Sequence, residues 1–166
     1  SLAFVDLIED DPQGVMWHTP AQTRRLLSLM NELHLAKVEA AKKLRTLVVG
    51  TVYKRTRPDP AQRGRRVQRA EVRFDNVAGC LRTPAGGSSR QTILVIEGKR
   101  VRSRLLSPRE AMRLMGLPDS YQIPDRYNDA YHVAGDGVVV PVVSYLEREL
   151  LTPLLRARTS PRRAAA

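Results

Sequence analysis

A single cysteine, Cys80, is the only thiol in the 166 residues, so an internal disulfide framework is excluded. The three histidines, at positions 18, 34 and 132, are too scattered to give the spacing of a metal site. No run of about 18 apolar residues occurs, and no cationic-then-apolar signal segment opens the chain. We therefore expect a cytoplasmic protein with no metal and no membrane partner.

Acidic residues are also scarce, with 17 Asp and Glu against 28 Lys and Arg, which gives a net charge of +11. A positive field of this size concentrates polyanions around a protein, and nucleic acid is a better candidate than an anionic membrane. The length fits one domain or two small lobes. The chain starts at Ser1 instead of a methionine, which suggests processing or excision from something longer.

Two segments have the residues of a capping box followed by a helix. In Thr19-Pro20-Ala21-Gln22 and in Ser107-Pro108-Arg109-Glu110, a hydroxyl and a Gln or Glu three residues later flank a proline at the first helical position. Apolar residues keep helical spacing from the first box to position 44, with an interruption near positions 31–35. After the second box, Gly116 and Pro118 end the helix after about two turns.

Strands are predicted between these helices. Residues 47–53 are rich in β-branched side chains, and residues 69–74 alternate between charged and apolar. Residues 93–96 and 101–105 flank Glu97-Gly98-Lys99 and indicate a hairpin. Its second strand places Arg100, Arg102 and Arg104 on one face, where they either line a cleft or simply solvate the sheet.

Two loops are candidates for nucleic-acid binding. The segment from Lys54 to Arg66 is strongly basic, and we expect a mobile loop that contacts phosphates, the alternative being a solvated surface loop. The segment 77–92 combines Gly86-Gly87 with side chains that hydrogen-bond bases and phosphates, although ordinary polar loops share this composition. With one helix residue added, the predicted DNA-binding residues are Arg55, Arg57, Arg65, Arg66, Arg82, Thr83, Gly86, Gly87, Ser88, Ser89, Arg90, Gln91 and Arg109.

The C-terminal third of the chain is predicted to contain two further helices. A short helix is expected at 129–134, and a longer one runs from about Val138 to Leu151 with apolar residues at helical spacing. Pro141 is tolerable only in the first turn of that second helix. The basic tail, residues 153–166, is predicted to be disordered.

The run Arg-Leu-Leu-Ser-Pro-Arg-Glu-Ala-Met-Arg-Leu-Met-Gly-Leu-Pro-Asp-Ser-Tyr at 104–121 resembles the ninth motif of the DNA cytosine-5 methyltransferases. Downstream, Ala-Gly-Asp-Gly-Val-Val-Val-Pro-Val at 134–142 resembles the tenth and last motif of that family. The resemblance implies that the 77–92 loop enters the major groove of double-stranded DNA. It also implies that the last helix packs on a Rossmann-like catalytic lobe.

The same resemblance implies a role for the start of the tenth motif. Its opening residues would form one wall of an S-adenosylmethionine pocket in the complete enzyme, and here these are Gly135, Asp136, Gly137 and Val138. Asp136 departs from the asparagine that is usual in the family.

The motifs that carry the chemistry of this family are absent from the 166 residues. They contain no Pro-Cys nucleophile, no Glu-Asn-Val acid, no Phe-x-Gly-x-Gly cofactor loop and no Gln-x-Arg-x-Arg segment. No catalytic residue is therefore assigned, and Cys80, which follows Gly79, is interpreted as a small structural residue of the kind that is usually buried. Methyl transfer to C5 of a flipped cytosine would need a thiolate from a catalytic lobe, on the same or a separate chain.

The sequence thus predicts an α+β fold: a small, mostly antiparallel recognition sheet with N-terminal helices and a C-terminal helix, lacking the Rossmann-like lobe. Its parts are a helical lead-in (1–45), a target-recognition region (46–106), the segment of the ninth and tenth motifs (107–152) and the tail. The expected function is DNA recognition for a cytosine-5 methyltransferase of the restriction-modification type, associated with the bacterial nucleoid. A stand-alone non-catalytic specificity subunit and a general basic nucleic-acid-binding module remain as alternatives. Without its lobe, the last helix should expose an apolar patch that self-associates or folds back.

Overall fold

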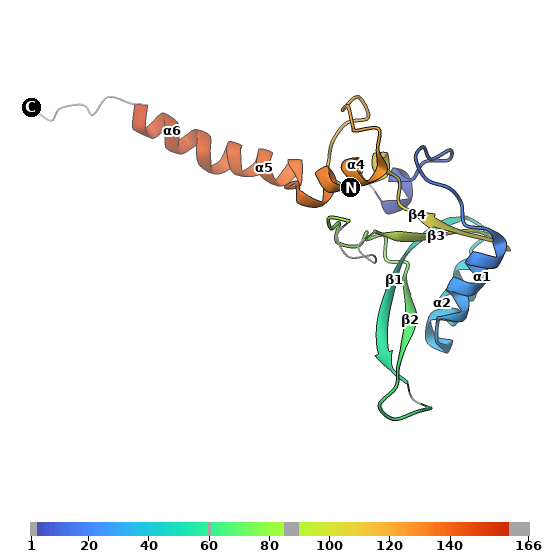
Figure 1. The fold of residues 1–166 in the computed structure, drawn as a ribbon. Helices are drawn as coiled ribbons and strands as arrows, with labels where there is room; N and C mark the ends of the chain where they lie inside the picture. Colours follow the sequence, from blue (N-terminus) through green and yellow to red (C-terminus); the bar gives the residue numbers. More distant parts are fainter. Residues whose placement is uncertain (1–2, 60, 85–89, 160–166) are drawn as a thin grey trace, which may run out of the picture.

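The structure is a computed structural model that describes residues 3–59, 61–84 and 90–159 (Figure 1). It is an α+β arrangement of one sheet and two groups of helices, as predicted. In chain order the elements are η1 (Phe4–Leu7), α1 (Pro20–Ser28), α2 (Glu32–Lys43), β1 (Leu47–Pro58), β2 (Arg66–Arg73), β3 (Thr92–Glu97), β4 (Arg100–Leu105), α3 (Pro108–Leu114), α4 (Tyr127–Asp136), α5 (Val140–Leu146), η2 (Glu147–Leu151) and α6 (Thr152–Thr159).

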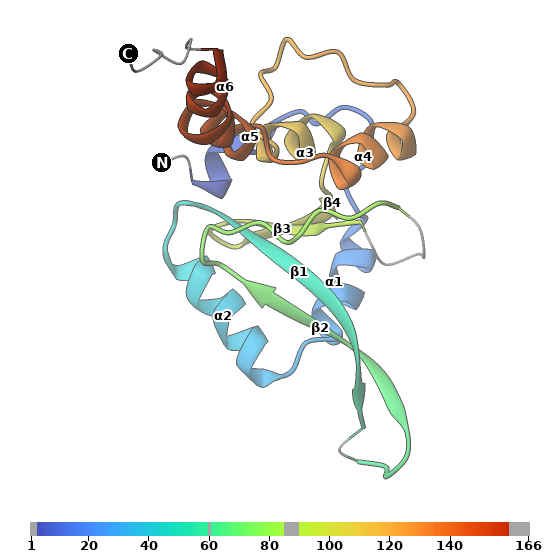
Figure 2. The same ribbon diagram turned by 90° about the vertical axis from the view of Figure 1, so that its left-hand side faces the viewer.

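The four strands form one antiparallel sheet in the order β2-β1-β3-β4. Helices α1 and α2 cover one face, while η1, α3 and α4 lie on the other (Figure 2). Each face has its own apolar core. Val52, Val72 and Leu94 point toward α1 and α2, whereas Val49 and Ile93 point toward α3 and α4. The alternation of strand side chains therefore divides the molecule into three layers.

Both predicted capping boxes are present. The Thr19 hydroxyl accepts the Gln22 amide proton at 3.2 Å, and the Gln22 side chain accepts the Thr19 amide proton at 2.8 Å. Ser107 and Glu110 make the same reciprocal pair, at 3.1 and 2.7 Å. Because each box satisfies amide groups that have no partner within the helix, the starts of α1 and α3 are fixed locally by the sequence.

Gly116 ends the ninth-motif helix as predicted, with φ at +79°. A Cβ at this position would lie 2.4 Å from Cδ of Pro141, so the glycine also lets the start of α5 approach the end of α3. The Val140 amide donates to the Met115 carbonyl at 2.9 Å, which fixes the same junction. The direction in which α5 leaves the domain is therefore set by the end of the ninth motif.

Arg104 does not belong to an exposed arginine row, which corrects the prediction for β4. Its side chain is fully buried and makes two hydrogen bonds to the Glu110 carboxylate, at 2.7 and 2.6 Å. Its guanidinium also lies over the Trp17 ring, 4.9 Å from the centroid. The Glu110 carboxylate accepts the Glu9 amide proton as well, at 2.8 Å. The N-terminal segment, β4 and α3 are thus joined by one buried ion pair.

The first hairpin is longer than predicted. Pairing between β1 and β2 continues from Thr51↔Arg73 to Pro58↔Arg66, so most of the expected mobile loop is strand, and only the turn between Pro58 and Arg66 remains. Charged side chains on both faces conceal the strand periodicity there, since neither face is buried. The hairpin extends beyond the rest of the sheet (Figures 1 and 2).

The C-terminal helical region projects away from the sheet, as Figure 1 shows. Elements α5 and η2 contain no buried residue, and apolar side chains such as Val142, Leu146 and Leu150 are about half exposed. The exposed patch predicted for this helix is therefore present. The helical conformation continues to Thr159, which corrects the prediction that disorder begins at residue 153; residues 160–166 lie outside the described part.

Candidate nucleic-acid interface

An open groove of about 1350 Å³ lies where the β1–β2 hairpin leaves the body of the domain. Tyr53, Arg55, Glu71 and Arg73 line it from the sheet face that carries α3 and α4. Residues of the 78–83 and 90–92 segments form the opposite wall. Among the described lining residues, one carboxylate, Glu71, faces five cations: Lys54, Arg55, Arg73, Arg82 and Arg90.

On the sheet side of the groove, the arginine side chains contact a tyrosine ring and two carboxylates. The Arg55 guanidinium lies 5.7 Å from the centroid of the Tyr53 ring and 3.5 Å from the Glu71 carboxylate. Arg73 forms an ion pair with Asp75, which raises the pKa of the arginine and lowers the pKa of the carboxyl group. One acid held between several arginines leaves the groove with a net positive charge, as a surface that binds polyanions requires.

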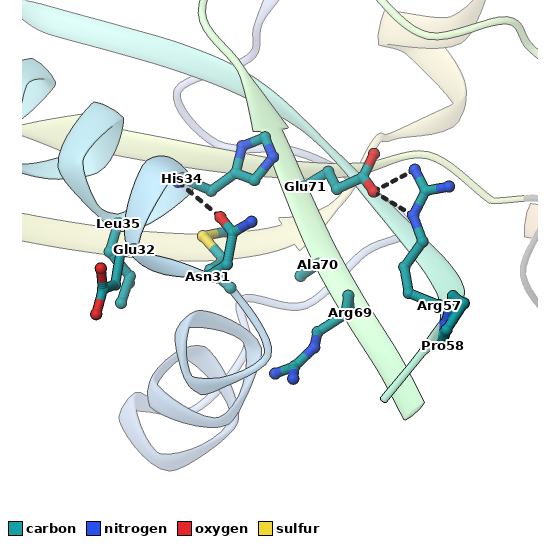
Figure 3. A pocket seen from close by; sticks show the side chains of 10 residues that line it. Asn31, Glu32, His34, Leu35, Arg57, Pro58, Arg69, Ala70 and Glu71 are labelled. Carbon is teal, nitrogen blue, oxygen red and sulfur yellow. Dashed lines mark hydrogen bonds and ion pairs between the residues drawn. The ribbon is translucent and has the colours of Figure 1, made fainter. Parts of the chain in front are cut away.

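Arg57, Arg65 and Arg66 lie outside this groove, nearer the turn of the hairpin. Arg57 donates to the Glu71 carboxylate at 2.5 Å and lines a second hollow of about 590 Å³ beside α2 (Figure 3). His34 also lines that hollow, and its Nδ1 accepts a hydrogen bond from the backbone amide of Val72 in β2, at 3.2 Å. The three arginines remain candidates for phosphate contact, on a protruding arm instead of a mobile loop.

The 77–92 loop, which we call the recognition loop, is anchored to the sheet by its described residues. Gly79 is buried, and a Cβ there would lie 1.8 Å from Oε1 of Gln91 and 3.0 Å from the Tyr53 hydroxyl. A larger residue here would have to displace the Gln91 amide group. Arg82 is exposed and Thr83 is half-buried, and both line the groove. The predicted residues Gly86, Gly87, Ser88 and Ser89 lie outside the described part of the chain.

Arg90 and Gln91 have different environments, although they are neighbours. Arg90 lines the groove, donates to Oδ1 of Asn128 at 2.6 Å and lies 5.6 Å from the Tyr127 ring centroid. Gln91 is buried, and its amide group donates to the Thr92 carbonyl at 3.1 Å and the Val52 carbonyl at 3.5 Å. The Gln91 side chain thus has an internal structural role, although the residue also belongs to the groove lining, and its part in DNA readout stays a prediction.

Two other residues have positions that differ from the predictions. Arg109 does not line the groove; its guanidinium donates to the Tyr121 carbonyl at 2.9 Å and holds the loop after α3. Cys80 is exposed and lies in the groove wall, so the expectation that it is buried is wrong. No cluster of three or more potential metal ligands occurs in the described ranges. No helix in those ranges is long and apolar enough to cross a membrane.

The start of the tenth motif is only partly accessible. Gly135 is pressed against the backbone of Arg82 and Thr83, and a Cβ at Gly137 would lie 2.9 Å from the Val133 carbonyl. Asp136 and Val138 are exposed. Gly135 is therefore packed within the chain, whereas Gly137 is exposed like its two neighbours, and none of these four residues lines the groove or the hollow beside α2.

Sequence reasoning did not identify Tyr53, Arg73, Tyr127 or Asn128 as part of this region. Tyr53 could have been found, because it shares a strand face with Arg55 at a spacing of two. Arg73 likewise pairs across the sheet with Thr51 on that face. The contacts of Tyr127 and Asn128 depend on tertiary packing alone, and no local pattern predicts them.

The described part of the chain is thus an antiparallel sheet with a cationic groove on one face. The family comparison gives the particular family. A family model described as C-5 cytosine-specific DNA methylase matches residues 9–152. Because the match covers most of the chain, the protein belongs to the C-5 cytosine-specific DNA methylases.

Curated relatives are similar over shorter regions. Type II methyltransferase M.SsoII of Shigella sonnei is 36% identical over 61 residues, which is 37% of this chain and 16% of that protein. Type II methyltransferase M.HhaI of Haemophilus parahaemolyticus is 42% identical over 52 residues, 31% of this chain and 15% of that protein. The aligned part is thus about a sixth of the length of these relatives. No solved structure matches the chain significantly.

Proposed function

We propose that this chain is the DNA-recognition portion of a cytosine-5 DNA methyltransferase and that it binds double-stranded DNA in the groove beside the β1–β2 hairpin. The observation that carries the proposal is the convergence of Arg55, Arg82 and Arg90 from three separate segments on one groove. Phosphate contacts from such arginines position a protein on a duplex, while contacts to base edges provide specificity. The hairpin arm would follow the backbone next to the groove.

Salt dependence distinguishes this function from that of a general basic module. We expect DNase footprinting at moderate salt to show protection of a defined sequence, since base contacts survive when phosphate contacts are screened. Binding that declines equally on all duplexes as salt rises would favour the general basic module. Poly(dI-dC) competitor at increasing concentration is the control for non-specific occupancy.

We further propose that the projecting helix packs on the catalytic lobe, of the same or a separate chain. Exposed apolar area of this extent is uncommon on a monomer and marks an interaction surface. Asp136 and Val138 at the base of α5 would then form the edge of an S-adenosylmethionine pocket that the lobe completes. When bound, the cofactor supplies the methyl group, and the carboxylate of Asp136 can accept a hydrogen bond from a hydroxyl or ammonium group.

The helix proposal predicts self-association of the chain on its own. Replacing Val142, Leu146 and Leu150 by glutamine should shift the protein toward monomer in sedimentation-velocity experiments. The midpoint of thermal unfolding should change little, because these side chains are about half exposed in the structure. A triple variant at the exposed polar positions Ser144, Glu147 and Arg148 is the matched control. Unfolding of the apolar variant, or unchanged association, would contradict the prediction.

A further inference from the structure

Helix α4 contacts the recognition loop at both ends of that loop. We call residues 81–83 and 90–91 the loop roots, since they are the described residues on either side of 85–89. Asn128, Tyr131 and Gly135 make the contacts, and their spacing of three and four residues places them on one face of the helix. A single helical face therefore touches both roots.

The N-terminal part of that face holds the second root. Oδ1 of Asn128 accepts a hydrogen bond from the Arg90 guanidinium at 2.6 Å, and the guanidinium lies over the Tyr127 ring. The hydroxyl of Tyr131, a fully buried residue, accepts the Gln91 amide proton at 3.0 Å. The Tyr127 and Tyr131 rings are stacked with centroids 5.6 Å apart, so the two anchors form one packed unit.

The C-terminal part of the face holds the first root. A Cβ at Gly135 would lie 2.5 Å from both the carbonyl carbon of Arg82 and the amide nitrogen of Thr83. Backbone atoms cannot move aside as a flexible side chain can, so the glycine permits a close approach that no other residue allows. The backbone of Arg82 and Thr83 is thus fixed relative to Asn128, about two helical turns away.

This arrangement leaves Arg90 with donors for a ligand. The residue lines the groove, and because its Nε is buried, the donors left for a ligand are the Nη protons that Asn128 does not use. One Nη2 bond to Asn128 fixes the plane of the guanidinium without using its remaining donors. An arginine whose plane is held in advance loses less conformational entropy when it forms a two-bond contact.

We propose that the face of α4 formed by Asn128, Tyr131 and Gly135 positions the two loop roots, and that Arg90, held by Asn128, reads a guanine edge in the groove. Arginine bonded to O6 and N7 of guanine is the commonest specific contact in the major groove. The inference rests on the proposed DNA-recognition function. It assigns Asn128 as a positioning residue that touches no base itself.

Selection from a randomised 30-base-pair duplex library by the purified protein tests the inference. The wild type should select a sequence in which one position prefers guanine by roughly 5- to 100-fold. Asn128→Ala and Arg90→Lys should each reduce that one preference to below roughly twofold and leave the other positions unchanged, because lysine keeps the charge but not the planar pair of donors. Asn128→Asp, which retains an acceptor for Arg90, should restore the preference.

The controls separate the possible failures. His132→Ala changes an exposed residue of the same helix and should leave the profile unchanged. A wild type that selects no sequence refutes the proposed function together with this inference. A wild-type preference that survives both Asn128→Ala and Arg90→Lys refutes the inference alone. Equal weakening on every duplex, with a shallower salt dependence, would make Arg90 a phosphate contact and also overturn it.

Discussion

We expect Glu110→Gln to lower the free energy of unfolding by about 3–5 kcal/mol. The substitution preserves the volume of the side chain but removes the charge that compensates Arg104. Both side chains are fully excluded from solvent in the native protein. An uncompensated guanidinium would then remain buried beside Trp17. Urea denaturation followed by circular dichroism measures the change.

The control is an ion pair of similar geometry at the surface. Arg113 and Asp119 are 2.7 Å apart, but the Asp119 side chain is 62% exposed. Asp119→Asn should therefore cost less than about 1 kcal/mol, since solvent screens an exposed pair. Equal effects of the two substitutions would show that the Arg104–Glu110 pair does not join β4 to α3 as the structure indicates. The comparison removes any general effect of losing a carboxylate.

The second large effect concerns DNA affinity. Replacing Arg55, Arg73 and Arg82 by glutamine removes three cations from one groove. Because each neutralised phosphate contributes about 0.9 to the slope of log K against log salt, three lost contacts should reduce that slope by about 2.7. Fluorescence anisotropy with a labelled duplex at several salt concentrations measures both the slope and the affinity.

A variant with the same net charge tests whether position matters. Arg24, Lys37 and Lys43 are exposed cations on α1 and α2, outside the groove lining. Their replacement by glutamine should leave the slope nearly unchanged if DNA occupies the groove. A slope that falls equally in both triple variants would mean that the overall charge of the protein, and not the groove, attracts DNA.

Local rules were sufficient for the helix starts and the second hairpin. Thr19 and Ser107 meet their partners three residues away, and Gly116 acts on its own backbone, so no tertiary information is needed. The β3–β4 hairpin follows from an apolar run before a glycine turn and an alternating strand after it. These features lie where short-range hydrogen bonding and strand alternation decide the conformation.

Prediction failed where partners are distant in the sequence or where burial gives no pattern. Arg104 shares its strand alternation with two other arginines, and only the approach of α3 and Trp17 makes it a core residue. The outer part of β1 carries polar side chains on both faces, so it has the composition of a loop. Gln91 was assigned by residue type, yet its amide fills the space beside Gly79.

The helix α4 illustrates the same limit for the candidate site. A helix near its position was predicted, but nothing in its sequence indicates that one face touches both loop roots. The contacts of Asn128 and Gly135 connect segments about 40 to 50 residues apart, and such contacts are set by how α4 packs on the sheet. Residue types in a loop therefore predict its chemistry better than they predict which side chains are accessible.

The central claim is that this chain recognises DNA while the chemistry belongs to residues that it does not contain. Incubation with S-adenosyl-methionine carrying a tritiated methyl group and duplex DNA, with DNA retention measured in the same samples, tests it most directly. The account predicts retained DNA and no tritium in cytosine. Methyl transfer to cytosine by this chain alone would contradict it.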